Sequence, residues 1–206
     1  MEVLRNLLLI FFNLFVVITA CAQSNLVLQK AFHNSYVDEG NKSYAAAISD
    51  IYPYYSDNSY EINIRLGWLH YLNKNYTASQ MYYSKAVNLV PTSVEAKFGY
   101  VKPLSVLKSW DKVLEQYKAI MKIDPQNTQA NYWTGVIYYY RRQYTTAIKY
   151  FKVVVVLYPF DYDGNHMLGW ASLMAGQKAE AKLYFEKALL IKPADESSTD
   201  GLEKAK

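Results

Sequence analysis

The chain has 206 residues, a formal net charge of +4, 51% hydrophobic residues and 19% charged residues, values typical of a packed globular protein rather than a disordered one. Eight glycines and six prolines are too few for an all-β protein with many tight turns. The positive charge is small and spread along the chain, so nucleic acid is not an expected partner. The unusual feature is the aromatic content, with 21 tyrosines, 8 phenylalanines and 4 tryptophans.

The N-terminal segment carries an apolar run over residues 7–20, LLLIFFNLFVVITA, which follows the basic residue Arg5. This run has the length of a signal-peptide core and is short for a membrane span. We therefore predict that residues 1–22 are a signal peptide and that the protein is exported, either to the periplasm or to a membrane-anchored position on the envelope side. An uncleaved signal anchor is the less favoured alternative.

Two cleavage sites fit this segment. Ala20-Cys21-Ala22 follows the small-x-small rule, which leaves a mature chain that begins at Gln23. Alternatively, residues 18–21 resemble a bacterial lipobox, in which Cys21 is lipidated and becomes the first mature residue. The sequence leaves both alternatives open, and membrane contact is expected only through such a lipid.

Four of the six prolines recur at intervals of 34 residues, and each closes a similar phrase: SKAVNLVP, YKAIMKIDP, FKVVVVLYP and FEKALLIKP. Small or aliphatic residues stand 24 and 12 residues before each proline, and an aromatic residue stands eight before it. So many shared offsets indicate an internal repeat. The recurring positions are Pro91, Pro125, Pro159 and Pro193; Gly67, Val101, Gly135 and Gly169; Ser79, Val113, Ala147 and Ala181; and Tyr83, Tyr117, Phe151 and Phe185.

The sizes of these residues suggest how a repeat folds. One small residue in each of two helices allows the helices to approach closely, and the aromatic residue can fill the gap to the next repeat. The proline ends the second helix. Polar residues that cap helix N-termini then restart the chain, and the predicted caps are Asn58 with Glu61, Thr92 with Glu95, and Asn127.

This pattern resembles the tetratricopeptide repeat family, particularly in residues 60–93, 128–161 and 162–195. The resemblance implies an all-α fold, a right-handed superhelical solenoid of antiparallel helix pairs with about five repeats over residues 26–195. The other repeats are 94–127 and a degenerate one at 26–59, where Ala45 takes the second small position and Asp57 stands in place of the proline. Residues 196–206 are expected to form a C-terminal cap or tail.

Two places depart from the pattern. The run Val153–Val156 has the local propensity of a strand, but we predict a helix because the repeat continues through it. The repeat 94–127 has Val101 and Val113 at the small positions and Pro103 inside its first helix. Because an internal proline usually kinks a helix, we predict that the stack changes curvature there.

No catalytic constellation is visible in the sequence. Glycine-rich phosphate loops are absent, and His33, His70 and His166 have no metal-ligand spacing to carboxylates or to Cys21. Asp161–Asn165 superficially resembles the start of a calcium loop, but His166 and Ser172 replace its required glycine and glutamate. We therefore predict a protein that is not an enzyme and needs neither cofactor nor metal.

In this family, the first helices of successive repeats line a concave groove, and the resemblance places aromatic residues there. Such residues provide large contact areas at low entropic cost, although packing of the solenoid itself would also explain several of them. The leading hypothesis is a protein–protein interaction scaffold of the bacterial cell envelope that binds a protein or peptide. The alternative is a glycan-binding envelope module that stacks sugars on Trp68, Tyr139 and Trp170. The residues predicted to bind the partner are Ile64, Trp68, Tyr71, Phe98, Lys102, Tyr132, Tyr139, His166 and Trp170.

Overall fold

The computed structural model describes residues 25–206, so the predicted signal peptide and Cys21 lie outside the described residues. Over residues 25–206 the regular secondary structure is helical, and no strand occurs there, which confirms the all-α prediction. The chain divides at Pro91 into two compact units, which we describe separately as the N-terminal unit (residues 25–91) and the C-terminal unit (residues 92–206). No helix in the described part of the chain has the length and apolar character required to cross a membrane.

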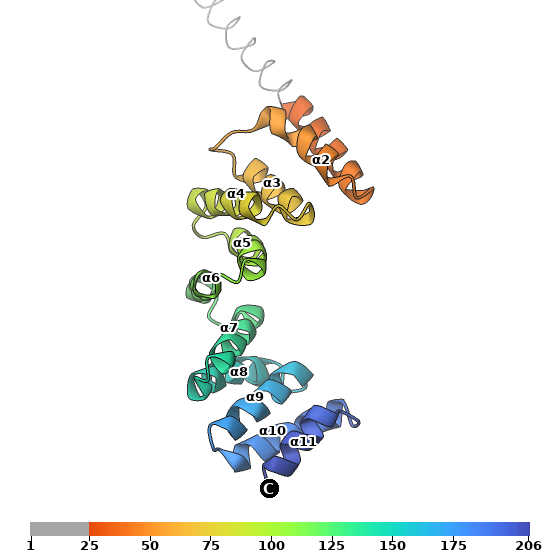
Figure 1. Cartoon of the computed structure of the whole chain (residues 1–206). Coiled ribbons are helices and arrows are strands. Elements are labelled where there is room, and N and C mark those ends of the chain that lie inside the picture. Colours follow the sequence, from red (N-terminus) through yellow and green to blue (C-terminus); the bar gives the residue numbers. More distant parts are fainter. Residues whose placement is uncertain (1–24) are drawn as a thin grey trace, which may run out of the picture. The chain divides into compact units, whose positions relative to one another are not determined.

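The N-terminal unit begins with a helix over residues 25–40, followed by α2 (Tyr44–Ile51), the 3-10 turn η1 (Tyr52–Tyr54), α3 (Tyr60–Leu72) and α4 (Tyr76–Leu89). Helix α3 packs against both α2 and α4 (Figure 1). The core of this unit is formed by Ala31, Ala47, Ile51, Ile62, Leu66, Leu69 and Tyr82.

The C-terminal unit consists of α5 (Val94–Val106), α6 (Trp110–Ile123), α7 (Thr128–Tyr140), α8 (Tyr144–Leu157), α9 (Tyr162–Met174), α10 (Lys178–Ile191) and α11 (Glu196–Lys204). Each helix packs against the next in sequence, and α11 also packs against α9. Short connections between neighbours make successive helices antiparallel. The C-terminal residues predicted as a cap or tail therefore contain a helix that covers the last repeat.

The first helices begin at polar caps that recur in every complete repeat. The side chains of Ser59, Ser93, Asn127 and Asp161 each accept a hydrogen bond from the backbone N–H three residues later. Asn127 is the predicted cap, but the predictions of Asn58 and Thr92 are wrong by one residue. Ser59 and Ser93 have the extended backbone that directs a cap side chain toward the first turn, and Glu61 and Glu95 lie in that turn.

A buried asparagine fastens the start of three first helices to the preceding turn. The amide of Asn131 donates to the backbone oxygens of Pro125 (3.0 Å) and Asn127 (2.9 Å). Asn165 makes the same pair of bonds to Pro159 (3.0 Å) and Asp161 (2.6 Å). Asn63 occupies the equivalent position in the first complete repeat. The side chain therefore satisfies carbonyl oxygens that a helix start and a turn would otherwise leave unpaired.

The recurring glycines of the first helices lie directly against the recurring aromatic rings of the second helices. A Cβ atom at Gly67 would lie 2.9 Å from the ring of Tyr83, and one at Gly135 would lie 2.6 Å from the ring of Phe151. The aromatic residue thus packs first against the glycine of its own repeat, whereas the sequence suggested the gap to the next one. Phe185 does both, since it touches Gly169 and also Gly201 of α11.

The degenerate first repeat corrects one prediction. Ala47 is fully buried in the N-terminal core, whereas the predicted small residue, Ala45, is exposed. The turn residues with positive φ show why, because Lys42 precedes its counterpart Lys74 by 32 residues, whereas Lys74 and Lys108 are 34 apart. Extrapolation by the full period therefore misplaced the buried position by two residues.

The two departures from the pattern are both accommodated within helices. Val153–Val156 lie inside α8, as predicted, because Val154 and Val155 are buried against neighbouring helices. Pro103 lies inside α5, which continues to Val106. The change of curvature at this repeat remains a prediction.

Candidate functional site

The residues predicted to bind a partner all lie on the first helices of the repeats. Helix α3 carries three of them, α5 and α7 carry two each, and α9 carries the last two. Eight are half-buried and Lys102 is exposed. Each unit therefore carries its own part of the candidate surface, and the contacts of each part determine which side chains a partner can reach.

In the N-terminal unit, Trp68 is held by a charged cluster beneath it. Its indole N–H donates to Glu39 Oε1 at 2.7 Å, and the other oxygen of this carboxylate pairs with Arg65. Arg65 is only 4% exposed and donates through Nε to Ser35 Oγ at 3.0 Å. Its guanidinium lies 3.9 Å from the ring centroid of Tyr36. This network fixes the orientation of Trp68 before any ligand is present.

The ring of Trp68 continues into a short aromatic stack. It lies parallel to Tyr71, with centroids 5.8 Å apart and planes 20° apart, and Tyr71 contacts Tyr76 of α4 at 5.7 Å. Ile64 lies one turn before Trp68 on α3 and is half-buried. The stack gives this unit a preformed aromatic surface that joins the two helices of one repeat.

In the C-terminal unit, Tyr132 and Tyr139 of α7 pack largely against the protein itself. Tyr132 contacts Phe151 with a centroid separation of 5.9 Å, and Tyr139 makes an edge contact with Tyr144 at 5.5 Å. Burial raises the pKa of Tyr132 to about 12 and also raises the pKa of Tyr139. Packing between the two helices of the repeat therefore accounts for much of the surface of both side chains.

The same helix presents two other aromatic side chains to solvent. Trp133 is 44% exposed and Tyr140 is 78% exposed. They are seven residues apart, so they lie on one face of the helix. None of the 13 residues of α7 is charged. The sequence analysis did not select Trp133 or Tyr140, although their spacing and the absence of charge could have identified them.

Helix α9 places His166 and Trp170 at a junction with α11. The Trp170 indole N–H lies 3.2 Å from His166 Nε2 and 3.1 Å from Ser197 Oγ. His166 Nε2 lies 2.9 Å from the same hydroxyl. Trp170 also makes an edge contact with Phe185 at 5.3 Å. These two predicted partner-binding residues therefore hold the C-terminal helix, which occupies part of the surface that a partner would use.

The surroundings of His166 keep its imidazole neutral. Burial lowers its pKa, and the carboxylates of Asp195 and Asp163 partly oppose this effect, while Lys192 adds to it. The ring stacks on Tyr162 at 5.3 Å, and Lys192 Nζ lies 3.5 Å from the centroid of Tyr162 on α9. With Nε2 beside the indole N–H, the neutral ring can accept a hydrogen bond that a protonated ring could not.

The remaining predicted residues lie on α5. Phe98 is half-buried against the core of its repeat and makes an edge contact with Tyr117 at 6.3 Å. Lys102 follows four residues later and is exposed. Helix α5 therefore contributes one packed ring and one cation. Within residues 25–206 there is no cluster of three or more His, Cys, Asp or Glu side chains that could hold a metal ion.

Comparison with known proteins places these features in context. Sequence models of the tetratricopeptide repeat match residues 60–92, 129–161 and 162–195. No curated protein matches the sequence significantly.

Similar folds occur among solved structures. A tetratricopeptide repeat protein from Parabacteroides merdae is 14% identical, with a TM-score of 0.75 over 87% of this chain and 72% of that one. MamA from Desulfovibrio magneticus is 17% identical, with a TM-score of 0.70 over 82% and 97%. YrrB, described as having an unusual peptide-binding site, is 13% identical, with a TM-score of 0.73 over 90% and 97%. At these identities the likeness concerns the fold.

Proposed function

Because the chain is a tetratricopeptide repeat protein, we propose that it is a non-catalytic interaction scaffold that holds a protein or peptide partner on its first helices. The observation that carries this proposal is the exposed face of α7. Trp133 and Tyr140 lie on one uncharged helical face and leave much of their ring surface open to solvent. Partly exposed aromatic side chains held by packed neighbours are typical of binding hot spots.

The chemistry of this face favours an apolar or aromatic segment of a partner. Tyr132 packs edge-on against Trp133 at 5.3 Å, and Tyr139 packs in the same way against Tyr140 at 5.6 Å. The half-buried tyrosines therefore support the exposed rings, which lose little conformational entropy on binding. A peptide rich in carboxylates would find no cation on α7 itself. The description of YrrB as a peptide-binding protein agrees with this type of ligand.

The proposal can be tested by placing a photo-crosslinking amino acid at Trp133 in the full chain, in cells that express it naturally. The matched control places the same crosslinker at Phe160, which is 72% exposed and lies in the turn between α8 and α9. We expect position 133 to give a crosslinked protein or peptide partner that position 160 does not give. Mass spectrometry of the adduct then identifies the partner.

Two results would contradict this function. Equal crosslinking at positions 133 and 160 would show that contact at α7 is not specific. A carbohydrate adduct at Trp133 would instead support the glycan-binding alternative. Tyr139 and Trp170, two of the rings considered for sugar stacking, already have ring contacts with Tyr144 and Phe185, and no contact in the structure favours that alternative.

We further propose that this scaffold acts in the bacterial cell envelope. The support is the sequence of residues 7–20, which has the length and apolar character of a signal-peptide core. Mass spectrometry of the mature N-terminus tests this directly. A chain that begins at Gln23 indicates ordinary export, a lipidated Cys21 indicates an anchored protein, and a mature chain that retains Met1 would argue against cleavage.

A further inference from the structure

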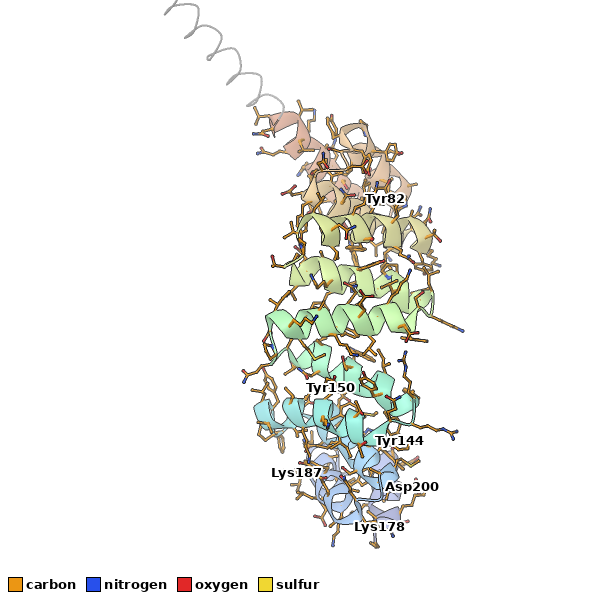
Figure 2. The ribbon with its side chains drawn as sticks, turned by 90° about the vertical axis from the view of Figure 1, so that its left-hand side faces the viewer. Tyr82, Tyr144, Tyr150, Lys178, Lys187 and Asp200 are labelled. Atoms are coloured by element: carbon orange, nitrogen blue, oxygen red, sulfur yellow. The ribbon has the colours of Figure 1, made fainter. Side chains whose placement is uncertain are left out.

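The C-terminal unit has two edges that differ in chemistry. Because its helices are antiparallel, the turns within the helix pairs lie at one end and the connections between pairs lie at the other. We call the first the turn edge (residues 106–112, 140–144 and 174–178) and the second the linker edge (residues 124–128, 158–163 and 192–196). Tyr144 and Lys178, labelled in Figure 2, are equivalent residues of successive repeats on the turn edge.

Basic residues occupy strained backbone positions on the turn edge. Lys108 and Arg142 have φ values of 55° and 58°, and the equivalent residue of the last pair is Gly176 at 79°. A side chain in this left-handed conformation costs roughly 1–2 kcal/mol, which glycine avoids. A cation near a helix C-terminus recovers about 0.3–1 kcal/mol. The backbone therefore does not by itself explain why two of three turns carry a cation where glycine fits.

The charges of the C-terminal unit are segregated between the two edges. The turn edge carries five basic side chains and one acid, Asp111, which is itself paired with Arg141 at 2.7 Å. The linker edge carries five acids, Asp124, Asp161, Asp163, Asp195 and Glu196, and one base, Lys192. The turn edge would thus attract an anionic surface while the linker edge was repelled from it.

Exposed apolar side chains lie between the cations of the turn edge. Leu107 is 41% exposed, Trp110 is 47% exposed and Met174 is 49% exposed. Tyr140 lies where this edge meets the exposed face of α7. Apolar and aromatic side chains interspersed with Lys and Arg are the combination that binds the interface of a bilayer, because the rings and aliphatic chains enter the headgroup region while the cations meet phosphates.

We propose that the turn edge docks on the surface of a lipid bilayer that contains anionic phospholipids. Lys108, Arg142 and Lys178 face the lipid phosphates, and Trp110 and Leu107 enter the interface. Several separate turns contribute side chains to one row, which suits a flat lipid surface better than an acidic peptide. Docking by this edge leaves Trp133, one and a half turns before the end of α7, for the partner. The proposal does not depend on the identity of that partner.

The test measures whether Trp110 meets lipid. Full-length protein is titrated with vesicles of phosphatidylcholine and phosphatidylglycerol that carry bromine-labelled acyl chains, and tryptophan fluorescence is followed. The Trp110→Phe variant identifies the signal of that residue among the four tryptophans. The charge variant is Lys108→Gly with Arg142→Gly, because glycine adopts positive φ without strain. Its matched control, Lys122→Gln with Lys149→Gln, removes two exposed cations from other parts of the same unit.

We expect quenching with phosphatidylglycerol that Trp110→Phe removes. Each cation near an anionic surface contributes about 1 kcal/mol, so the lipid concentration for half-maximal quenching should rise roughly 30-fold in the double glycine variant. The matched control should change little. Vesicle flotation of the same samples shows whether protein remains bound by another segment, in which case the glycine variant floats but loses Trp110 quenching.

Several outcomes would overturn the proposal. These are equal quenching by pure phosphatidylcholine, unchanged quenching in Trp110→Phe, and equal losses in the glycine variant and its control. Binding to soluble polyglutamate in place of vesicles, with loss in the glycine variant, would assign the edge to an acidic macromolecule instead.

Discussion

Gly169 lies directly beneath the ring of Phe185, so close that a Cβ atom at residue 169 would be 2.8 Å from Cδ1 of the ring. The ring is fully buried and also touches Gly201 on α11. One aromatic side chain therefore occupies the space that two glycines leave between three helices. This relationship explains the recurrence of glycine in the sequence more directly than helix propensity, which disfavours it.

Replacement of Gly169 by leucine should destabilise the C-terminal unit. The added side chain must displace Phe185, and overpacking of this kind costs roughly 1–3 kcal/mol. The measurement is the urea midpoint of unfolding, and Phe185→Leu in the same chain should recover part of the loss. Gly40→Ala is the control, because no atom outside its own helix backbone and chain neighbours lies within 4 Å of a Cβ placed there. An unchanged midpoint in Gly169→Leu would mean that the two helices do not meet.

Removal of the asparagine that fastens α9 should loosen the start of that helix. In Asn165→Ala the carbonyl oxygens of Pro159 and Asp161 lose their side-chain donor. A buried polar group left unpaired costs about 1–3 kcal/mol. Hydrogen exchange should accelerate in the first turn of α9, while α7, whose own asparagine is Asn131, remains protected. Unaltered exchange at α9 would show that water or another group replaces the amide.

The stability of the C-terminal unit should fall in mild acid because of His166. Burial lowers the pKa of this residue below its ordinary value of 6.5, so the unfolded chain binds a proton more readily than the folded one. The stabilising contribution is complete above pH 6.5 and is lost as the pH falls through the folded pKa. Urea midpoints followed by tryptophan fluorescence between pH 7.5 and pH 5 measure this loss.

The variant His166→Gln separates this effect from general acid destabilisation. Glutamine retains a polar group beside Trp170 and Ser197 but does not titrate in this range. We expect a smaller decrease between pH 7.5 and pH 5 than in the natural protein. Identical pH dependences would show that other groups, such as His70 in the N-terminal unit, account for the change; burial lowers the pKa of that residue as well.

Truncation of Tyr117 should separate the unfolding of the two compact units. Its ring is 5% exposed within the core of repeat 94–127, and burial raises its pKa to about 12. Large-to-small changes at such sites cost about 3–5 kcal/mol. Because neighbouring repeats stabilise one another locally, hydrogen exchange in Tyr117→Ala should accelerate in α5–α7 before it does so in α3. Equal acceleration in α3 would indicate a single cooperative unit.

The periodic features of the fold were predictable from the sequence because each recurs at a fixed interval. The helical state of Val153–Val156 followed from the repeat that runs through them, against their local propensity. The positions of Gly67, Gly135 and Gly169 also followed, since small residues mark close helix approaches. The caps at Ser59 and Ser93 did not follow, because two adjacent polar residues compete there and only the backbone direction distinguishes them.

The candidate surface was only partly predictable for a related reason. The sequence by itself determined which helices carry the aromatic residues, because the repeat fixes the order and length of the helices. It could not determine that Tyr132 packs inside the repeat while its neighbour Trp133 remains exposed, nor that Ser197 meets His166 across 31 positions of the chain. Only the tertiary structure decided these points, since the exposure of a side chain depends on the neighbouring helices that cover it, and chain spacing does not specify those neighbours.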